Sequence, residues 1–278
     1  MGFGQIATPT AGNTGRFATE HILEFQMVKN FFEKYAKPTK SSSLTKVDCY
    51  NTQTSTNFCK CVQSFWYDIR VSERITINGV TKSAIDWVGA VFPSHTNQWS
   101  NELVLLDGEV NNLKEGLWGV SDARNSDTLD TYTGDGTKLF KYVKDTIAAI
   151  RYHIDPFISQ TLVAQKDRVG QMLNDLETIY LPQITKTING RQVTWRSLDL
   201  QTKWNTYMRT QNAAAITNSF RLVDLYLDKL VDGYTSVAQR EAAERGTPDA
   251  LILKGLIEKI DALQADWTNN RPVWTNPM

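Results

Sequence analysis

The sequence predicts a mainly α-helical protein, in which an antiparallel, heptad-patterned helical bundle carries a β-hairpin insertion and follows a smaller α+β region. Two observations lead to this fold class. Apolar residues recur at alternating spacings of three and four in five segments of the second half, as in helices that pack nearly antiparallel. Asn-Gly pairs at 78–79 and 189–190 lie between alternating segments, which is typical of two-residue hairpin turns. We therefore expect an extended arm over residues 1–18, a small α+β region over 19–97 and the bundle over 98–278.

The composition is that of an ordinary soluble globular protein. Of 278 residues, 41% are apolar and 22% are charged, and 30 Lys and Arg balance 30 Asp and Glu. This balance gives no overall field that would attract nucleic acid or anionic lipid, although a local patch for nucleic acid stays open. No apolar run reaches the roughly 18 residues that a membrane helix needs. We therefore expect a soluble protein that does not insert into membranes.

The N-terminal part is expected to contain an arm, a helix and a small sheet. Residues 1–18 are rich in Gly, Thr and Ala and have no periodicity, which indicates an arm that is ordered only where something holds it. Thr19 is expected to cap a helix that ends before Pro38. The apolar face of this helix is Ile22, Phe25, Val28, Phe32 and Tyr35. After it, alternation predicts strands that contain Cys59, Cys61, Phe65, Tyr67, Ile69 and Val71.

The three cysteines are Cys49, Cys59 and Cys61. An odd number in one short region is a poor disulfide framework, and the spacing lacks the paired C-x2-C of structural zinc sites. The sequence therefore predicts three reduced cysteines that face inward from strands, in a reducing compartment and without a metal ion.

Five apolar stripes and the residues between them define the helices of the expected bundle. Asp155-Pro156 should break one helix, because proline lacks a donor and clashes with the preceding turn, and Gly246 with Thr247-Pro248 should separate the last two. For residues 197–245 the sequence allows two alternatives. They form one helix of up to about 48 residues, or the helix is broken near residues 210–219. The stripes are Leu103, Leu106, Val110, Leu113 and Leu117; Phe140, Val143, Ile147, Ile150 and Ile154; Val169, Met172, Leu176 and Ile179; Phe220, Val223, Leu227, Leu230, Tyr234 and Val237; and Leu253, Leu256, Ile260, Leu263 and Trp267.

The motifs of common catalytic and cofactor sites are absent from the sequence. His153 lies beside Asp155, a pair that can orient an imidazole for acid–base chemistry. The stretch GDGT at 134–137 can present backbone donors to a phosphate, but no Lys-Ser/Thr pair completes a phosphate-binding loop. We therefore expect no catalytic residue, no cofactor and no metal, and an enzyme that uses His153 and Asp155 is a less favoured alternative.

A hairpin is expected over residues 184–195, between a helix that ends at Leu181-Pro182 and one that restarts near Ser197. This order, with INGRQVTWRSLDL at its centre, resembles the head-to-tail joining (connector) proteins of tailed bacteriophages over about thirty residues. In that family a basic hairpin precedes a helix that starts with a Ser-x-x-Asp/Leu pattern. The resemblance implies a ring-forming virion connector, although this chain is far longer and its N-terminal region has no counterpart there.

The leading hypothesis is a non-enzymatic, self-assembling structural protein, a virion component of connector, neck or coat type that is assembled in the host cytoplasm. Its expected partners are further copies of itself and other structural proteins. A projecting hairpin exposes side chains for contact with a neighbouring chain, and tryptophans often anchor such contacts. The alternatives are a hairpin that only covers its own bundle, and a cytoplasmic scaffold or adaptor that binds a protein partner. The candidate interface residues are Asn189, Gly190, Arg191, Gln192, Trp195 and Trp274.

Overall fold

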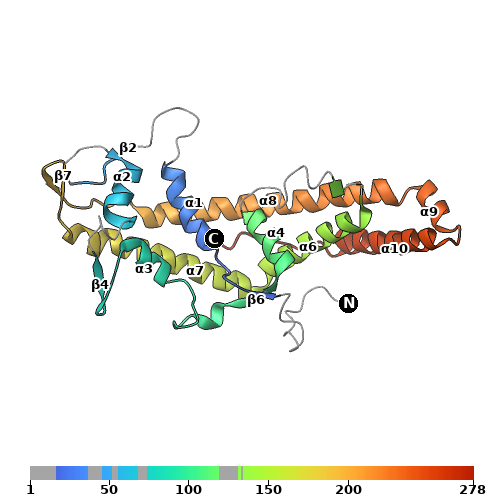
Figure 1. Cartoon of the computed structure of the whole chain (residues 1–278), viewed down its shortest axis with the longest axis horizontal. Coiled ribbons are helices and arrows are strands. Elements are labelled where there is room, and N and C mark those ends of the chain that lie inside the picture. Colours follow the sequence, from blue (N-terminus) through green and yellow to red (C-terminus); the bar gives the residue numbers. More distant parts are fainter. Residues whose placement is uncertain (1–16, 37–45, 52–55, 68–73, 119–130, 133) are drawn as a thin grey trace. The chain divides into compact units, whose positions relative to one another are not determined.

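The computed structural model is mainly helical, with small antiparallel sheets (Figure 1). This confirms the predicted dominance of helix. The structure describes residues 17–36, 46–51, 56–67, 74–118, 131–132 and 134–278.

The chain folds as two compact units, and each is discontinuous in sequence. The first unit takes in the described residues up to Glu20, then Leu105–Ser159 and Thr210–Pro277, whereas the second takes in His21–Val104 and Gln160–Arg209. These divisions do not coincide with the boundaries expected at residues 18 and 97, because segments far apart in the sequence pack together within each unit.

The described residues of the first unit form helices and one two-stranded sheet, in which β1 pairs with β6. Thr19 lies in β1, so the expectation that Thr19 caps a helix is wrong, and the helix that follows begins only at Phe25. The helix expected from Leu103 likewise begins at Gly108, after β6. The elements are β1 (Phe17–Glu20), β6 (Val104–Asp107), α4 (Gly108–Trp118), α6 (Gly136–Ile154), most of α8 (Leu200–Tyr234), α9 (Val237–Ala243) and α10 (Pro248–Asn269).

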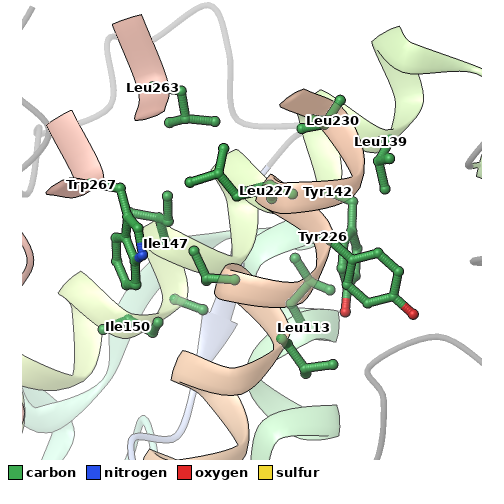
Figure 2. Packing of buried hydrophobic residues seen from close by; sticks show 14 of the residues in the cluster. Leu113, Leu139, Tyr142, Ile147, Ile150, Tyr226, Leu227, Leu230, Leu263 and Trp267 are labelled. Carbon is green, nitrogen blue, oxygen red and sulfur yellow. The ribbon is translucent and has the colours of Figure 1, made fainter. Parts of the chain in front are cut away.

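The core of the first unit is an apolar cluster contributed by α4, α6, α8 and α10. Figure 2 shows its centre, where Ile147 and Leu227 face Trp267 and Leu263. Gly136 opens α6 where a Cβ atom would lie 2.7 Å from the Tyr234 ring and 2.8 Å from Leu256, so a larger residue there would displace these two side chains. Among the predicted stripe residues, Ile179 in the second unit is 48% exposed and Val237 of α9 is 74% exposed, so neither of these two is buried.

Two helix breaks lie where the local signals predicted them, whereas the break at Thr235 and Ser236, between α8 and α9, was not predicted. Asp155 separates α6 from α7 (Pro156–Asp175), and its carboxylate accepts hydrogen bonds from the backbone N–H groups of Phe157 and Ile158. Thr247 caps α10 with Pro248 at its first turn. Helix α8 is continuous through residues 210–219 and ends at Tyr234, so it is shorter than 48 residues but not interrupted.

Where the structure describes the second unit, helices are combined with three antiparallel strand pairs, β2 with β3, β4 with β5 and β7 with β8. Its core is aromatic: the Phe31 ring lies 5.4 Å from that of Trp204, and the Phe32 ring lies 5.6 Å from that of Trp66. The elements are α1 (Phe25–Ala36), β2 (Lys46–Val47), β3 (Thr56–Asn57), α2 (Phe58–Val62), a π-helical turn (Gln63–Tyr67), β4 (Ile75–Ile77), β5 (Val80–Lys82), α3 (Ala84–Ala90), a 3-10 turn (Ser100–Glu102), the rest of α7, a second π-helical turn (Leu176–Tyr180), a 3-10 turn (Leu181–Gln183), β7 (Lys186–Ile188), β8 (Arg191–Val193) and the start of α8.

The segment expected to form strands around Cys59 is helical from Phe58 to Tyr67. The buried residues Cys61, Val62, Phe65 and Trp66 recur after one and four positions, which is the spacing of one face of a helix rather than of a strand. Asn57 starts this helix, since its side chain accepts a hydrogen bond from the Cys59 N–H. The remaining residues of that prediction, Ile69 and Val71, lie outside the described residues, as do residues 1–16 of the expected arm and Pro38.

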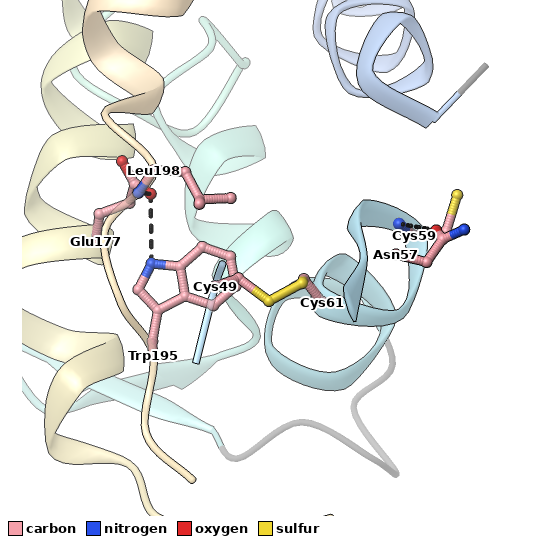
Figure 3. The surroundings of a disulfide bond; sticks show 7 residues. All are labelled: Cys49, Asn57, Cys59, Cys61, Glu177, Trp195 and Leu198. Atoms are coloured by element: carbon pink, nitrogen blue, oxygen red, sulfur yellow. Dashed lines mark hydrogen bonds between the residues drawn. A yellow bond between two sulfur atoms is a disulfide. The ribbon is translucent and has the colours of Figure 1, made fainter. Parts of the chain in front are cut away.

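Two of the three cysteines form a disulfide, which overturns the prediction that all three are reduced. Cys49 and Cys61 are joined with their Cα atoms 6.3 Å apart, while Cys59 is an exposed free thiol (Figure 3). The odd number of cysteines led to the wrong prediction because a chain with three cysteines can contain one disulfide and one free thiol. Disulfides of this kind persist in oxidising surroundings, so the argument for a reducing compartment from cysteine number fails.

Candidate functional site

The tip of the β7–β8 pair is exposed and has a defined conformation. Ile188 pairs with Arg191, and the two residues between them, Asn189 and Gly190, have φ angles of 51° and 76°. Positive φ at both positions is the mark of a tight turn whose twist matches that of the strands. The four predicted interface residues of the tip, Asn189, Gly190, Arg191 and Gln192, are all exposed.

Trp195, in contrast, belongs to the core of the second unit. It is 2% exposed, its ring lies 5.6 Å from that of Phe65 and 5.7 Å from that of Trp66, and it forms an isolated bridge with Tyr50. The prediction that Trp195 is presented to a neighbouring chain is therefore wrong. The chain leaves β8 by crossing this aromatic cluster, and the indole fills it.

Glu177 organises the connection from the hairpin to α8. Its buried carboxylate accepts hydrogen bonds from the backbone N–H groups of Leu198 at 2.7 Å and Leu200 at 2.6 Å. It also accepts from Trp195 Nε1 and Ser197 Oγ, both at 3.3 Å. Figure 3 shows the hydrogen bond from Trp195 to Glu177. Burial raises the pKa of Glu177, and these hydrogen bonds oppose that rise. The carboxylate thus supplies acceptors for the free N–H groups that every helix start leaves.

The base of the hairpin is also joined to the segment that carries the disulfide. Asn51 N–H donates to the Thr194 carbonyl at 3.2 Å, and Arg196 N–H donates to the Cys49 carbonyl at 2.8 Å. Cys49 is in turn bridged to α2 through Cys61. An exposed turn therefore stands on a base that is held by aromatic packing, a buried carboxylate and a covalent bridge.

His153 does not form the predicted pair with Asp155. Its ring is 2% exposed, and both ring nitrogens lack a hydrogen-bond partner among the described residues, while Asp155 is engaged at the start of α7. Burial, and then the charge of Lys114, lowers the pKa of His153 to about 3. The imidazole is therefore neutral and has no carboxylate to orient it for acid–base work.

The His153 ring is enclosed by aromatic side chains of the first unit. The Trp274 ring stacks on it at 4.9 Å with an angle of 8° between the planes, and the rings of Trp118 and Tyr152 meet it edge to face at 5.6 and 5.2 Å. Trp274 is 8% exposed, so it is not available as the surface anchor that the sequence predicted. No sequence signal pointed to this cluster, because its members come from α4, α6 and the C-terminal residues.

The other sequence motifs have structural explanations. Asp135 of GDGT caps α6 by accepting a hydrogen bond from the Lys138 N–H at 3.1 Å, which places a carboxylate where a bound phosphate would have to lie. Among the described residues no group of three or more His, Cys, Asp and Glu is arranged to hold a metal ion. Within the same residues, no helix has the length and apolar character needed to cross a membrane.

The described residues of the second unit form hollows of two kinds. One, of about 660 Å³, has a mixed lining whose charged side chains include Arg74, Lys82 and Asp86. The other, of about 400 Å³, is apolar and lies between α1 and α2, with Phe58 and Val62 in its wall. Neither contains any of the candidate residues named above.

Comparisons with known proteins give no family for this chain. No protein-family model matches it, and neither the curated proteins nor the solved structures that were searched include a match.

Proposed function

We propose that the chain is a non-enzymatic structural protein that assembles with copies of itself, as a virion component of connector, neck or coat type. In this proposal the first unit is an antiparallel helical bundle that serves as the rigid body of each subunit. The β7–β8 tip of the second unit contacts a neighbouring subunit. The virion assignment rests on the resemblance of INGRQVTWRSLDL to head-to-tail joining proteins.

The observation that carries this proposal is the contrast between the tip and the base of the hairpin. A two-stranded element is marginally stable by itself, yet this one is held at its base by Trp195, Glu177 and the Cys49–Cys61 bridge. A turn that is fixed in this way loses little conformational entropy when it binds, which favours association. Arg191 at the exposed tip supplies a planar cation suited to a partner carboxylate.

Exposed apolar residues on the first unit support association as well. Leu251 and Ile252 at the start of α10 are 64% and 70% exposed. Apolar side chains of this size next to one another on a helix suit burial against another protein.

The β4–β5 pair offers a matched control for a test of the hairpin. It has the same construction, with Asn78 and Gly79 at positive φ and Ile77 paired with Val80. Val80 and Thr81 therefore occupy the positions that Arg191 and Gln192 occupy in β7–β8. Both pairs of residues are exposed, so charge can be added to either without burial.

The test compares Arg191→Glu/Gln192→Glu with Val80→Glu/Thr81→Glu by native mass spectrometry and sedimentation over a range of concentrations. We expect the wild-type chain and the β4–β5 variant to form the same oligomer, and the β7–β8 variant to dissociate. A wild-type chain that stays monomeric at the highest concentration would refute self-assembly. Equal oligomers for both variants would remove the hairpin from the interface.

A further inference from the structure

The last residues of the chain form an extended segment that lies along α8. This C-terminal segment, residues 270–278, follows α10 and contains neither helix nor strand. Arg271 donates to Asp224 at 2.8 Å, Trp274 stacks on His153, and Asn276 accepts from Asn212 Nδ2 at 2.8 Å. Contacts of these three side chains hold the segment in place.

The contacts follow a regular register. Positions 271 and 276 of the segment meet positions 224 and 212 of α8, so the segment runs opposite to the helix. Twelve helical residues rise about 18 Å, and five extended residues span about 17 Å. The match means that the segment follows one face of α8 in a fully extended form. We call the residues that it contacts, His153 of α6 and Asn212, Phe220 and Asp224 of α8, the docking surface.

Two prolines prepare the segment for this shape. Pro272 and Pro277 have a fixed φ, and the residues that precede them, Arg271 and Asn276, are restricted to extended conformations. The segment is therefore stiff before it binds and loses less entropy on any surface that fits it. The residues that link it to α10, from Thr268 to Asn270, are exposed, so the link itself can move without breaking buried packing of its own.

The docked segment leaves polar atoms of the first unit unsatisfied. Trp118 Nε1, both nitrogens of His153 and Asn212 Oδ1 are buried without a hydrogen-bond partner among the described residues. A buried polar atom without a partner costs free energy. Within the segment only Trp274 is buried, and its neighbour Val273 is 81% exposed. Trp274 is thus the buried anchor of the segment, whereas Arg271 and Asn276 hold it from exposed or half-buried positions, which permits exchange.

We propose that in the assembled protein the C-terminal segment binds the docking surface of a second copy, so that each subunit gives one segment and receives one. This inference rests on the proposed self-assembly and specifies the contact that joins one subunit to the next. Every copy carries both the Arg-x-x-Trp-x-Asn sequence and the surface that binds it, so the contacts within one chain and between two chains are identical. The equilibrium between segments bound within their own chain and segments bound to a second copy then depends on the effective concentration of the docking surface. A closed ring of subunits raises the effective concentration of the neighbour's docking surface and so favours exchange.

The test uses full-length chains that carry single reactive cysteines in a Cys59→Ser background. One chain carries Asp224→Cys and the other Arg271→Cys, because these two side chains touch and are both about half exposed. The chains are mixed, allowed to assemble and treated with a short bismaleimide. A covalent dimer of the two different chains is expected, whereas a mixture of Asp224→Cys with Val237→Cys, at an exposed position of α9, should give none. Trp274→Ala in the Arg271→Cys chain should abolish the cross-link.

A charge exchange supplies a second measurement in case the cysteines disturb the contact. Asp224→Arg and Arg271→Glu each break the pair within a chain, but a mixture restores it when the segment of the Arg271→Glu copy meets the docking surface of the Asp224→Arg copy. We expect each variant alone to assemble less well than the mixture. If the wild-type chain assembles but the cross-link and the rescue are both absent, segment exchange is refuted while self-assembly stands. If the wild-type chain never assembles, both proposals fail.

Discussion

Glu177 in the second unit and His153 in the first are both buried ionisable side chains, but their surroundings differ in kind. Glu177 accepts four hydrogen bonds, whereas neither nitrogen of His153 has a partner among the described residues. Hydrogen bonds determine the course of the backbone around Glu177. Around His153, the contacts are packing contacts between rings. The comparison teaches that burial by itself does not tell how much a polar residue stabilises the fold.

The physical chemistry of the two sites gives opposite expectations for substitution. A donor that loses its only buried acceptor costs the full desolvation of that donor, whereas an unsatisfied group replaced by an apolar one of the same shape costs little. Variants of the Glu177 site should therefore be strongly destabilising. Variants of His153 that keep the ring should not be.

The largest expected effect is that of Trp195→Ala, which removes the indole packed on Phe65 and Trp66 together with one donor to Glu177. We expect a loss of about 3–5 kcal/mol in the free energy of unfolding, measured by denaturant titration. A variant that unfolds like the wild type but no longer associates would contradict this assignment and support the exposed interface position that the sequence predicts for Trp195.

Replacement of Glu177 by leucine should cost about 3 kcal/mol or more, because it leaves the N–H groups of Leu198 and Leu200 without acceptors in a buried site. Glu177→Gln keeps one carbonyl oxygen and should lose clearly less. The two variants are compared in urea with intrinsic fluorescence as the readout. Equal losses would mean that the volume of the side chain, and not its acceptors, matters at the start of α8.

Acid should destabilise the first unit through His153. Its pKa is about 3 in the folded chain and about 6.5 when unfolded, so the unfolded chain binds one more proton between these values. The contribution of His153 to stability is complete above pH 6.5 and is lost as the pH falls toward 3, at about 1.4 kcal/mol per pH unit. Near pH 5 the expected loss is about 2 kcal/mol, measured as the pH dependence of unfolding.

The smallest effect is expected for His153→Phe. The phenyl ring keeps the stack on Trp274 and removes two unsatisfied nitrogens, so the free energy of unfolding at pH 7 should change by less than about 1 kcal/mol or increase. The pH dependence between 6.5 and 5 should become shallower. A loss of several kcal/mol at neutral pH would show that the imidazole makes a hydrogen bond that stabilises the fold.

The sequence predicted those features whose cause is local. The positive φ angles at Asn189 and Gly190, the cap at Thr247 and the break at Asp155-Pro156 each depend on residues a few positions apart, and each is present. The helix over residues 58–67 was missed because alternate apolar residues in a short segment fit a strand as well as one face of a helix.

The candidate sites were beyond reach of the sequence for a different reason. Glu177 acts on backbone groups about twenty residues later, and His153 meets Trp274 from the far end of the chain. No spacing rule connects such residues, because their contact depends on how whole helices pack. Cys49 and Cys61 belong to the same class, since a count of cysteines does not reveal which pair lies within bonding distance.

The discontinuity of the second unit determines when its aromatic core can close during protein synthesis. Phe31 and Trp66 leave the ribosome early, but Trp195 and Trp204, which pack against Phe65 and Phe31, come more than a hundred residues later. At typical translation rates this interval is on the order of ten seconds. Throughout it, the N-terminal aromatic side chains lack their final partners and are natural targets for chaperones. Residues 21–104 are thus synthesised long before the rest of the second unit, which is complete only when the hairpin and the start of α8 have been made.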